Sequence, residues 1–131
     1  MKDELKINQL SPQAYECYLS YLKAVDATDA EAYGKFLAED CVFQFGNNPI
    51  VNGKKAILEG LEKFWASYDG EEHILQNILG TDECFALEAI NVYKRKDGKK
   101  VSVPAVAITQ RNAEGLVTSF RVFIDIAPLY A

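Results

Sequence analysis

The chain has 131 residues, 49% of them hydrophobic and 25% charged, with a formal net charge of −5. This length fits a single domain that spans residues 1–131. A phosphate backbone requires a basic protein face, so the acidic balance argues against a nucleic-acid partner. The one dense basic cluster surrounds Asp97-Gly98, and we interpret it as the solvated tip of a hairpin. No apolar run approaches the ~20 residues needed to cross a bilayer, so no membrane partner is expected.

The cysteine pattern indicates neither a disulfide framework nor a metal site. Cys17, Cys41 and Cys84 are odd in number and widely spaced, and a single histidine adds no ligand cluster. No glycine-rich phosphate loop is present, and we expect no cofactor. The charged N-terminus, Met1–Glu4, is not followed by an apolar stretch, so no secretory signal is expected. These features favour a soluble protein in the cytoplasm.

The first half of the chain predicts three helices and one short strand. Ser11-Pro12 has the cap and first-turn proline of a helix start, and apolar residues then recur every three or four positions up to Val25. The capping-box spacing at 28–31 opens a short second helix that runs through Leu37. A strand is predicted from Cys41 to Phe45, followed by a turn. Asn52-Gly53 precedes a third helix with an apolar side formed by Ile57, Leu61, Phe64, Trp65 and Tyr68.

The second half predicts four strands, at about 72–79, 84–95, 100–111 and 116–126, joined by short turns. Helices followed by strands are typical of an α+β fold, with the helices grouped on one face of a mostly antiparallel sheet. A curved sheet closed by helices forms a cone, and its hollow is a candidate ligand site. The turn at Lys96–Lys99 allows a two-residue turn or a three-residue loop with a glycine bulge, and these alternatives differ by one residue in register.

The last three strands are apolar on both faces. In the first of them, Phe85, Leu87 and Ala89 alternate with Ala86 and Ile90, where a half-exposed strand would place polar side chains. Strands of this kind are covered on both sides, and three helices cover only one face of such a sheet. We therefore expect a homodimer that forms through the sheet.

Three local marks accompany this order of elements, in which 25–29 (VDATD) ends the first helix. They are 37–43 (LAEDCVF), 52–57 (NGKKAI) and 73–77 (HILQN). With these marks in this order, the chain resembles the NTF2-like superfamily over nearly its whole length, and within it a SnoaL-like domain. The resemblance implies a cone-shaped fold with a deep apolar pocket and frequent dimers. The superfamily includes ketosteroid isomerase, limonene epoxide hydrolase, polyketide cyclases and scytalone dehydratase, so the fold does not determine the reaction.

Two catalytic sets of that superfamily are incomplete in this chain. In the resemblance to ketosteroid isomerase, the oxyanion tyrosine falls on Tyr21, but the general base falls on Phe45 and the second oxyanion acid on Ala107. Since phenylalanine and alanine carry no proton, the sequence argues against a steroid isomerase of that mechanism.

The epoxide hydrolase set is also incomplete. In the resemblance to limonene epoxide hydrolase, the triad positions fall on Ala89, Asn91 and Val122. Asn47 alone remains of the residues that hold the hydrolytic water. The sequence therefore argues against epoxide hydrolysis by that route.

The resemblance to scytalone dehydratase is the most complete, because a strand histidine and a helix-end aspartate of that enzyme fall on His73 and Asp26. Its carbonyl-polarising tyrosine falls on Phe45. His73 is the only histidine, and histidine is the side chain best suited to exchange protons near neutrality. We expect His73 to act as base and then acid, Asp26 to hold its tautomer and Tyr21 to donate to a carbonyl oxygen.

These residues also have a structural interpretation. His73 is then a hydrogen-bonded surface histidine near Glu71 and Glu72, and Asp26 is a loop residue that binds backbone. The catalytic interpretation predicts a mostly apolar pocket in which His73 is the one titratable base and no acid is present. The expected ligand-binding residues are Tyr18, Phe45, Asn47, Trp65, Asn77, Asn91, Ala107 and Val122.

The leading functional hypothesis is a cofactor-free dehydratase, isomerase or cyclase that acts on a small carbonyl or polyketide-like compound through His73 and Asp26. The first alternative is a non-catalytic binding protein or carrier for a small apolar ligand, because several catalytic positions hold apolar residues. The second alternative is a dimeric protein-interaction module, which requires an apolar surface patch that dimerisation leaves uncovered.

Overall fold

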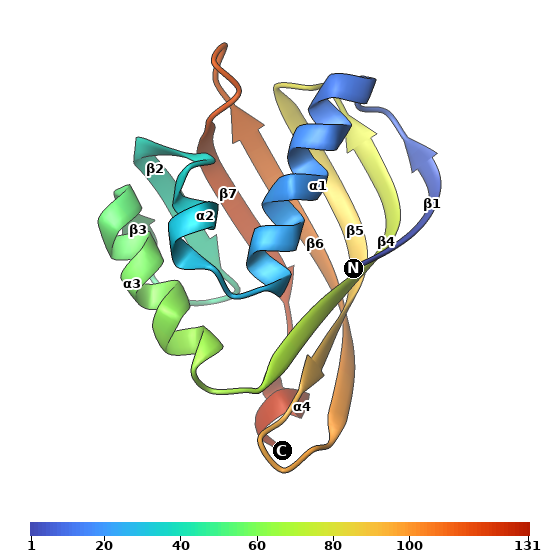
Figure 1. Ribbon diagram of the computed structural model, residues 1–131, viewed down its shortest axis with the longest axis vertical. Helices are drawn as coiled ribbons and strands as arrows, with labels where there is room; N and C mark the ends of the chain where they lie inside the picture. The colour runs from blue at the N-terminus through green and yellow to red at the C-terminus, as the bar shows by residue number, and fades with distance from the viewer.

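A computed structural model describes residues 1–131 as one curved sheet with helices over its concave face (Figure 1). The strand order is β1-β4-β5-β6-β7-β2-β3. The β1–β4 and β2–β7 pairs are parallel and the other neighbours are antiparallel, which confirms the α+β fold with a mostly antiparallel sheet. The strands are β1 (Lys2–Asn8), β2 (Leu37–Phe45), β3 (Val51–Asn52), β4 (Gly70–Gly80), β5 (Cys84–Lys94), β6 (Lys100–Arg111) and β7 (Val117–Ile124).

The helices are α1 (Pro12–Asp26), α2 (Ala30–Gly34), α3 (Lys54–Trp65) and the one-turn α4 (Ala127–Tyr130). The predicted caps are present, since Ser11 Oγ accepts a hydrogen bond from the Ala14 amide and Asp29 Oδ1 accepts one from the Ala32 amide. Each of these bonds satisfies an otherwise free N–H of the first helical turn. In Figure 1, α1 and α2 lie in front of the sheet and α3 covers the side formed by β2 and β3.

The structure differs from the sequence predictions at several helix and strand ends, and it adds two edge strands and the one-turn α4; the third helix ends at Trp65, so Tyr68 lies beyond it. The second helix ends at Gly34, and the following strand starts at Leu37 rather than Cys41, because parallel pairing with β7 begins at Leu37. β1 and β3 are too short or too polar to show a sustained apolar alternation, and they lie at the two edges of the sheet, where they are held by backbone pairing and by the packing of Leu5 and Val51 against the core.

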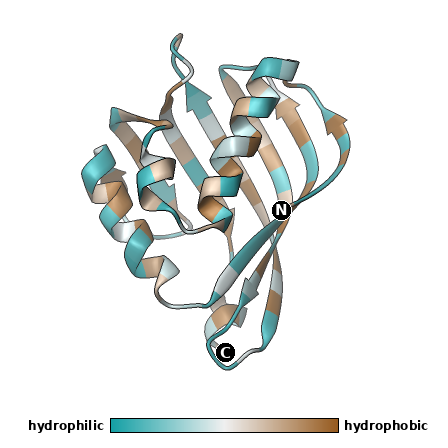
Figure 2. Cartoon of the chain, viewed as in Figure 1, coloured by the Kyte–Doolittle hydropathy of each residue, from teal (hydrophilic) through white to brown (hydrophobic).

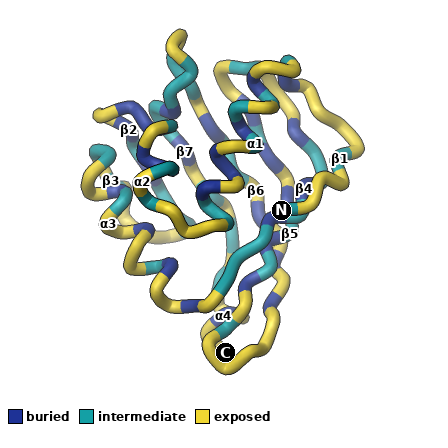
Figure 3. The backbone as a smooth tube through the Cα atoms, viewed as in Figure 1, coloured by how far each residue is buried: buried dark blue, intermediate teal, exposed yellow.

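The core lies between the helices and the inner face of the sheet. Brown and teal bands alternate along the strands in Figure 2, and the buried positions in Figure 3 follow the central strands and the sheet-facing side of α1. A cluster of 25 buried hydrophobic residues forms this core. No helix is both long enough and apolar enough to cross a membrane.

The hairpin between β5 and β6 uses the three-residue loop with a glycine bulge. The Gly98 amide donates to the Arg95 carbonyl, the Arg95 amide donates to the Lys99 carbonyl, and Gly98 has a φ of +88°. This register places Ala89 opposite Ala105. Both alanines therefore lie on the inner face and leave space beneath the helices.

The outer face of the sheet carries apolar side chains that nothing in the monomer covers. Val106 lies between Glu88 and Phe123 in the cross-strand register, and it is 36% exposed while Phe123 is 52% exposed. The homodimer through the sheet stays a prediction, and this face is where we expect it to form. Cytoplasmic localisation also stays a prediction.

The substitution Val106→Glu is expected to dissociate such a dimer, because it places a charge beside Glu88 in the apolar patch. Sedimentation velocity at micromolar concentration would show a dimer for the original chain and a monomer for the variant. Ala56→Glu, at an exposed position of α3, is the matched control and should stay dimeric. A monomer for the unaltered chain would contradict the prediction.

Candidate active site

A cavity of about 80 Å³ lies between the helices and the inner face of the sheet. Of its 20 lining residues 17 are hydrophobic, so its wall presents few polar groups to a ligand. Its small volume favours a ligand of few heavy atoms. The lining residues are Tyr18, Tyr21, Leu22, Val25, Tyr33, Phe43, Phe45, Leu61, Phe64, Trp65, Glu71, His73, Leu87, Ala89, Asn91, Tyr93, Ala105, Ala107, Phe120 and Val122.

The structure brings His73 and Asp26 together. Asp26 is the last residue of α1 and His73 lies in β4. The His73 Nδ1 to Asp26 Oδ1 distance is 2.5 Å, and the His73 backbone amide donates to Asp26 Oδ2 at 3.2 Å. The Asp26 carboxylate therefore binds both the imidazole ring of His73 and the backbone of β4. Nε2 is left as the ring nitrogen that can exchange a proton within the cavity.

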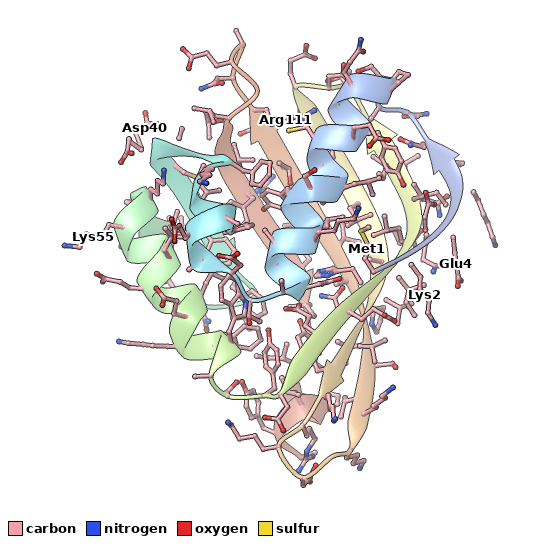
Figure 4. The ribbon with its side chains drawn as sticks, viewed as in Figure 1. Met1, Lys2, Glu4, Asp40, Lys55 and Arg111 are labelled. Atoms are coloured by element: carbon pink, nitrogen blue, oxygen red, sulfur yellow. The ribbon has the colours of Figure 1, made fainter.

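The end of β1 also contacts this aspartate. The Met1 ammonium lies 3.3 Å from Asp26 Oδ2 and 3.5 Å from Glu72 Oε2. Figure 4 shows Met1 beside β4, close to the C-terminal end of α1. The His73 and Asp26 side chains are only 11% and 12% exposed, so their interaction is shielded from solvent.

The groups around His73 favour its protonated form more strongly than water favours that form of an exposed histidine. Burial lowers the pKa of His73, but the hydrogen bond to Asp26 and the charges of Glu71 and Asp26 outweigh burial, so the pKa is raised. A raised value lets the imidazole hold a proton it has accepted and release it near neutral pH.

Glu71 is an acid within the cavity wall, and the expectation of a pocket without acids is wrong. Its side chain is 5% exposed and its Oε2 lies 3.8 Å from His73 Nε2. The Tyr68 hydroxyl donates to Glu71 Oε1 at 2.7 Å. Burial raises the pKa of Glu71, against the lowering effects of the His73 charge and the Tyr68 hydrogen bond. The sequence contained a signal for this position, because Glu71 comes two residues before His73 and residues two apart on a strand share one face.

Tyr21 is placed to donate a hydrogen bond into the cavity. The Tyr33 hydroxyl donates to the Tyr21 oxygen at 2.5 Å, so Tyr21 keeps its own proton for another acceptor. Burial raises the pKa of Tyr21 and keeps the phenol protonated. Both rings line the cavity beside Tyr18, with the Tyr18 and Tyr21 ring centroids 5.4 Å apart.

Asn91 carries an unsatisfied oxygen next to His73. The two residues are direct partners across β4 and β5, and Asn91 is 4% exposed. Its Nδ2 donates to the Tyr93 hydroxyl at 3.3 Å, while its Oδ1 is buried without a hydrogen-bond partner. A buried polar atom without a partner is costly, and a ligand with a hydrogen-bond donor would satisfy it.

Two expected ligand contacts lie away from the cavity. Asn77 follows a register shift between Leu75 and Asn77, which turns its side chain to the outer face, where it donates to Glu88 at 2.7 Å. Asn47 lies exposed in the turn after β2. The other predicted positions in the cavity wall are Tyr18, Phe45, Trp65, Ala107 and Val122. No three His, Cys, Asp or Glu side chains gather in a way that could hold a metal ion.

Solved structures with low sequence identity share this fold. A candidate SnoaL-like polyketide cyclase from Shewanella denitrificans OS-217 has a TM-score of 0.77 at 16% identity, covering 88% of this chain and 92% of that chain. An LEH-like epoxide hydrolase from M. tuberculosis has a TM-score of 0.74 at 15% identity, covering 90% and 86%. An NTF2-like protein of unknown function from Burkholderia pseudomallei K96243 has a TM-score of 0.79 at 10% identity, covering 91% and 95%.

No curated protein is significantly similar to the sequence. The family model of the SnoaL-like domain matches residues 18–120, which extend from α1 to β7 and include every residue of the cavity wall except Val122. The fold expected from the sequence is thereby confirmed, and the chain belongs to the SnoaL-like domain family.

Proposed function

We propose that the protein is a cofactor-free enzyme that moves a proton next to the carbonyl group of a small or polyketide-like compound. The observation that carries the proposal is the contact between Asp26 and His73 at the wall of an apolar cavity. A buried histidine with a fixed tautomer and an accessible second nitrogen is the arrangement used for general acid–base catalysis. The similarity in fold to a candidate polyketide cyclase is consistent with this substrate class.

The chemistry follows from the positions of three side chains. Nδ1–H of His73 donates a hydrogen bond to Asp26, so Nε2 has the lone pair that accepts a proton from the carbon beside the carbonyl. Tyr21 donates a hydrogen bond to the carbonyl oxygen, where negative charge develops. The imidazolium then returns its proton to a second carbon in an isomerisation, or to a departing hydroxyl in a dehydration.

The occupant is expected to carry a hydrogen-bond donor besides its carbonyl. Asn91 Oδ1 lies buried beside His73 without a partner, and a hydroxyl group on the ligand would donate to it. A hydroxyl placed beside the imidazole is also the group that a dehydration would protonate and expel. The size of the cavity limits the compound to a small one.

Hydrogen–deuterium exchange tests this function without a known substrate. A panel of small hydroxyketones and 1,3-diketones is incubated with the protein in D₂O, and loss of the proton beside the carbonyl is followed by NMR. We expect at least one compound to exchange faster with the folded protein than with heat-denatured protein at equal concentration. Exchange equal to the denatured control across the panel would contradict the proposal.

A second candidate function is binding without catalysis. Phe45, Ala89, Ala107 and Val122 line the cavity at positions where relatives place catalytic groups, and these apolar side chains suit a carrier of a small apolar molecule. Native mass spectrometry of the purified protein distinguishes the two, because a carrier is expected to retain its ligand. A protein-interaction module remains a third proposal, for which a stable partner in pull-down experiments would be the support.

A further inference from the structure

Glu71 is the one acidic side chain in the cavity wall, and the proposed reaction through His73 does not use it. It comes two residues before His73 on β4 and faces the same side of the sheet. The Glu71 Oε2 to His73 Nε2 distance of 3.8 Å is too long for a direct hydrogen bond. Neighbouring atoms of one ligand could therefore contact both groups.

The surroundings of the pair disfavour several buried charges at once. Asp26 lies on the α1 side of His73, and the Met1 ammonium lies against Asp26. Tyr68 faces Glu71 from the turn between α3 and β4 and Tyr93 faces it from β5, and both are uncharged phenols. Glu72 is 41% exposed, and no lysine or arginine forms an ion pair with Glu71.

Two protonation states of the pair have the same net charge. In one, His73 is an imidazolium and Glu71 a carboxylate, so that two opposite charges lie in the cavity wall. In the other, the proton lies on Glu71 and both groups are neutral. Burial favours the state with fewer charges, while attraction to Asp26 favours the imidazolium. Such opposing effects make the two groups titrate as a pair.

We propose that Glu71 is a second catalytic residue, which shares one proton with His73 and donates it to the oxygen of the bound compound. This inference rests on the proposed function, because it assigns the acid that works beside the His73 base. The site then contains both partners of a concerted proton transfer. Tyr21 holds the oxygen by a hydrogen bond while Glu71 delivers the proton.

The step balances within the site. The C–H bond beside the carbonyl breaks, its proton goes to His73 Nε2, and its electron pair forms the carbon–carbon double bond of an enol. The O–H bond of Glu71 breaks and the carbonyl oxygen takes that proton. His73 is left as the imidazolium and Glu71 as the carboxylate, which are attracted to each other across the enol. Transfer of the two protons in the reverse direction restores the starting state.

The test uses Glu71→Gln, whose amide can still accept the hydrogen bond from Tyr68, and Glu72→Gln as the matched control on the opposite face of β4. Infrared difference spectra across pH are expected to show the carbonyl stretch of a protonated carboxylic acid in the original chain and in E72Q. The band should be missing in E71Q.

NMR titration of the only histidine should show a lower His73 pKa in E71Q, because a partly ionised neighbour is removed.

Both results are required for a shared proton. A carboxylic acid band with an unchanged His73 titration would mean that Glu71 is always neutral, and a lowered titration without a band would mean that it is always ionised. Either outcome overturns the inference. Neither outcome concerns the proposed function, which fails if no compound in the D₂O panel exchanges or if the exchange does not depend on His73. In that panel E71Q is expected to slow exchange by about 10²-fold.

Tyr68→Phe provides a variant that does not alter Glu71 itself. It removes the hydrogen bond that lowers the pKa of Glu71, so the carboxylic acid band should persist to higher pH than in the original chain. A band that titrates at the same pH in both proteins would show that it belongs to another carboxyl group, which would also overturn the inference.

Discussion

Replacement of His73 by glutamine is expected to lower the rate of enzyme-dependent proton exchange by about 10²–10⁴-fold. Glutamine keeps a hydrogen-bonding side chain at this position of β4, but its amide neither accepts nor releases a proton near neutral pH. The backbone amide of residue 73 can still donate to Asp26 Oδ2, so the link between α1 and β4 is retained. The measurement is exchange of the proton beside the carbonyl in D₂O, with the most reactive compound of the panel.

The matched control for this variant is Asn77→Ala, on the same strand but on the outer face. It is expected to leave the exchange rate unchanged. Thermal unfolding followed by circular dichroism verifies that the His73 variant is folded at the assay temperature. Exchange at the original rate in a folded H73Q protein would show that His73 is not the base and would contradict the proposed mechanism.

The substitution Asp26→Asn is expected to affect both the base and the fold. The amide has the shape of the carboxylate, but it loses the charge that favours the imidazolium and it no longer selects one tautomer. We expect a lower His73 pKa, and an exchange rate that falls by about 10–100-fold, as found for groups that orient a catalytic residue. Loss of a hydrogen bond to a charged group should also lower the free energy of unfolding by about 2 kcal/mol.

The dependence of stability on pH provides a separate measurement on the same variant. Because the pKa of His73 is raised on folding, its contribution to stability is complete below the unfolded value of ~6.5 and is lost as the pH rises through the folded value. Removing the Asp26 charge should reduce this loss. Urea unfolding at several pH values would therefore show a smaller decline for D26N than for the original chain, and an equal decline would contradict the prediction.

The parts of the fold that follow local rules were predictable from the sequence. Ser11 and Asp29 cap helices because their side chains accept hydrogen bonds from the first helical turn, which is a local property. The apolar runs of β5 and β6 similarly predicted two strands of the sheet, while the covering of their outer faces stays a prediction. β1 was missed because its residues, KDELKIN, contain only Leu5 and Ile7 as an apolar pair, and the backbone pairing with β4 that places it at the edge of the sheet is not revealed by the sequence.

The part of the candidate site that the family resemblance pairs, His73 with Asp26, was predictable. The positions of Asn77 and Glu71 depend on the three-dimensional structure and were not. The contact between His73 and Asp26 joins residues 47 positions apart, and no spacing rule brings such residues together. Asn77 was misplaced because strict alternation ignores a register shift. Glu71 was overlooked because glutamate is seldom buried, and its position depends on the Tyr68 hydroxyl and the closed cavity wall.

The register shift after Leu75 divides β4 into two segments that can vary independently. Before it, alternate residues point into the cavity and supply Glu71 and His73; after it, the opposite set points inward and places Ile78 in the core. Changes in the first segment can therefore alter the chemistry while the second continues to anchor the strand. Leu75, the next inward position of the first segment, is fully buried in the core and does not line the cavity, so the polar groups that β4 offers to a ligand are Glu71 and His73.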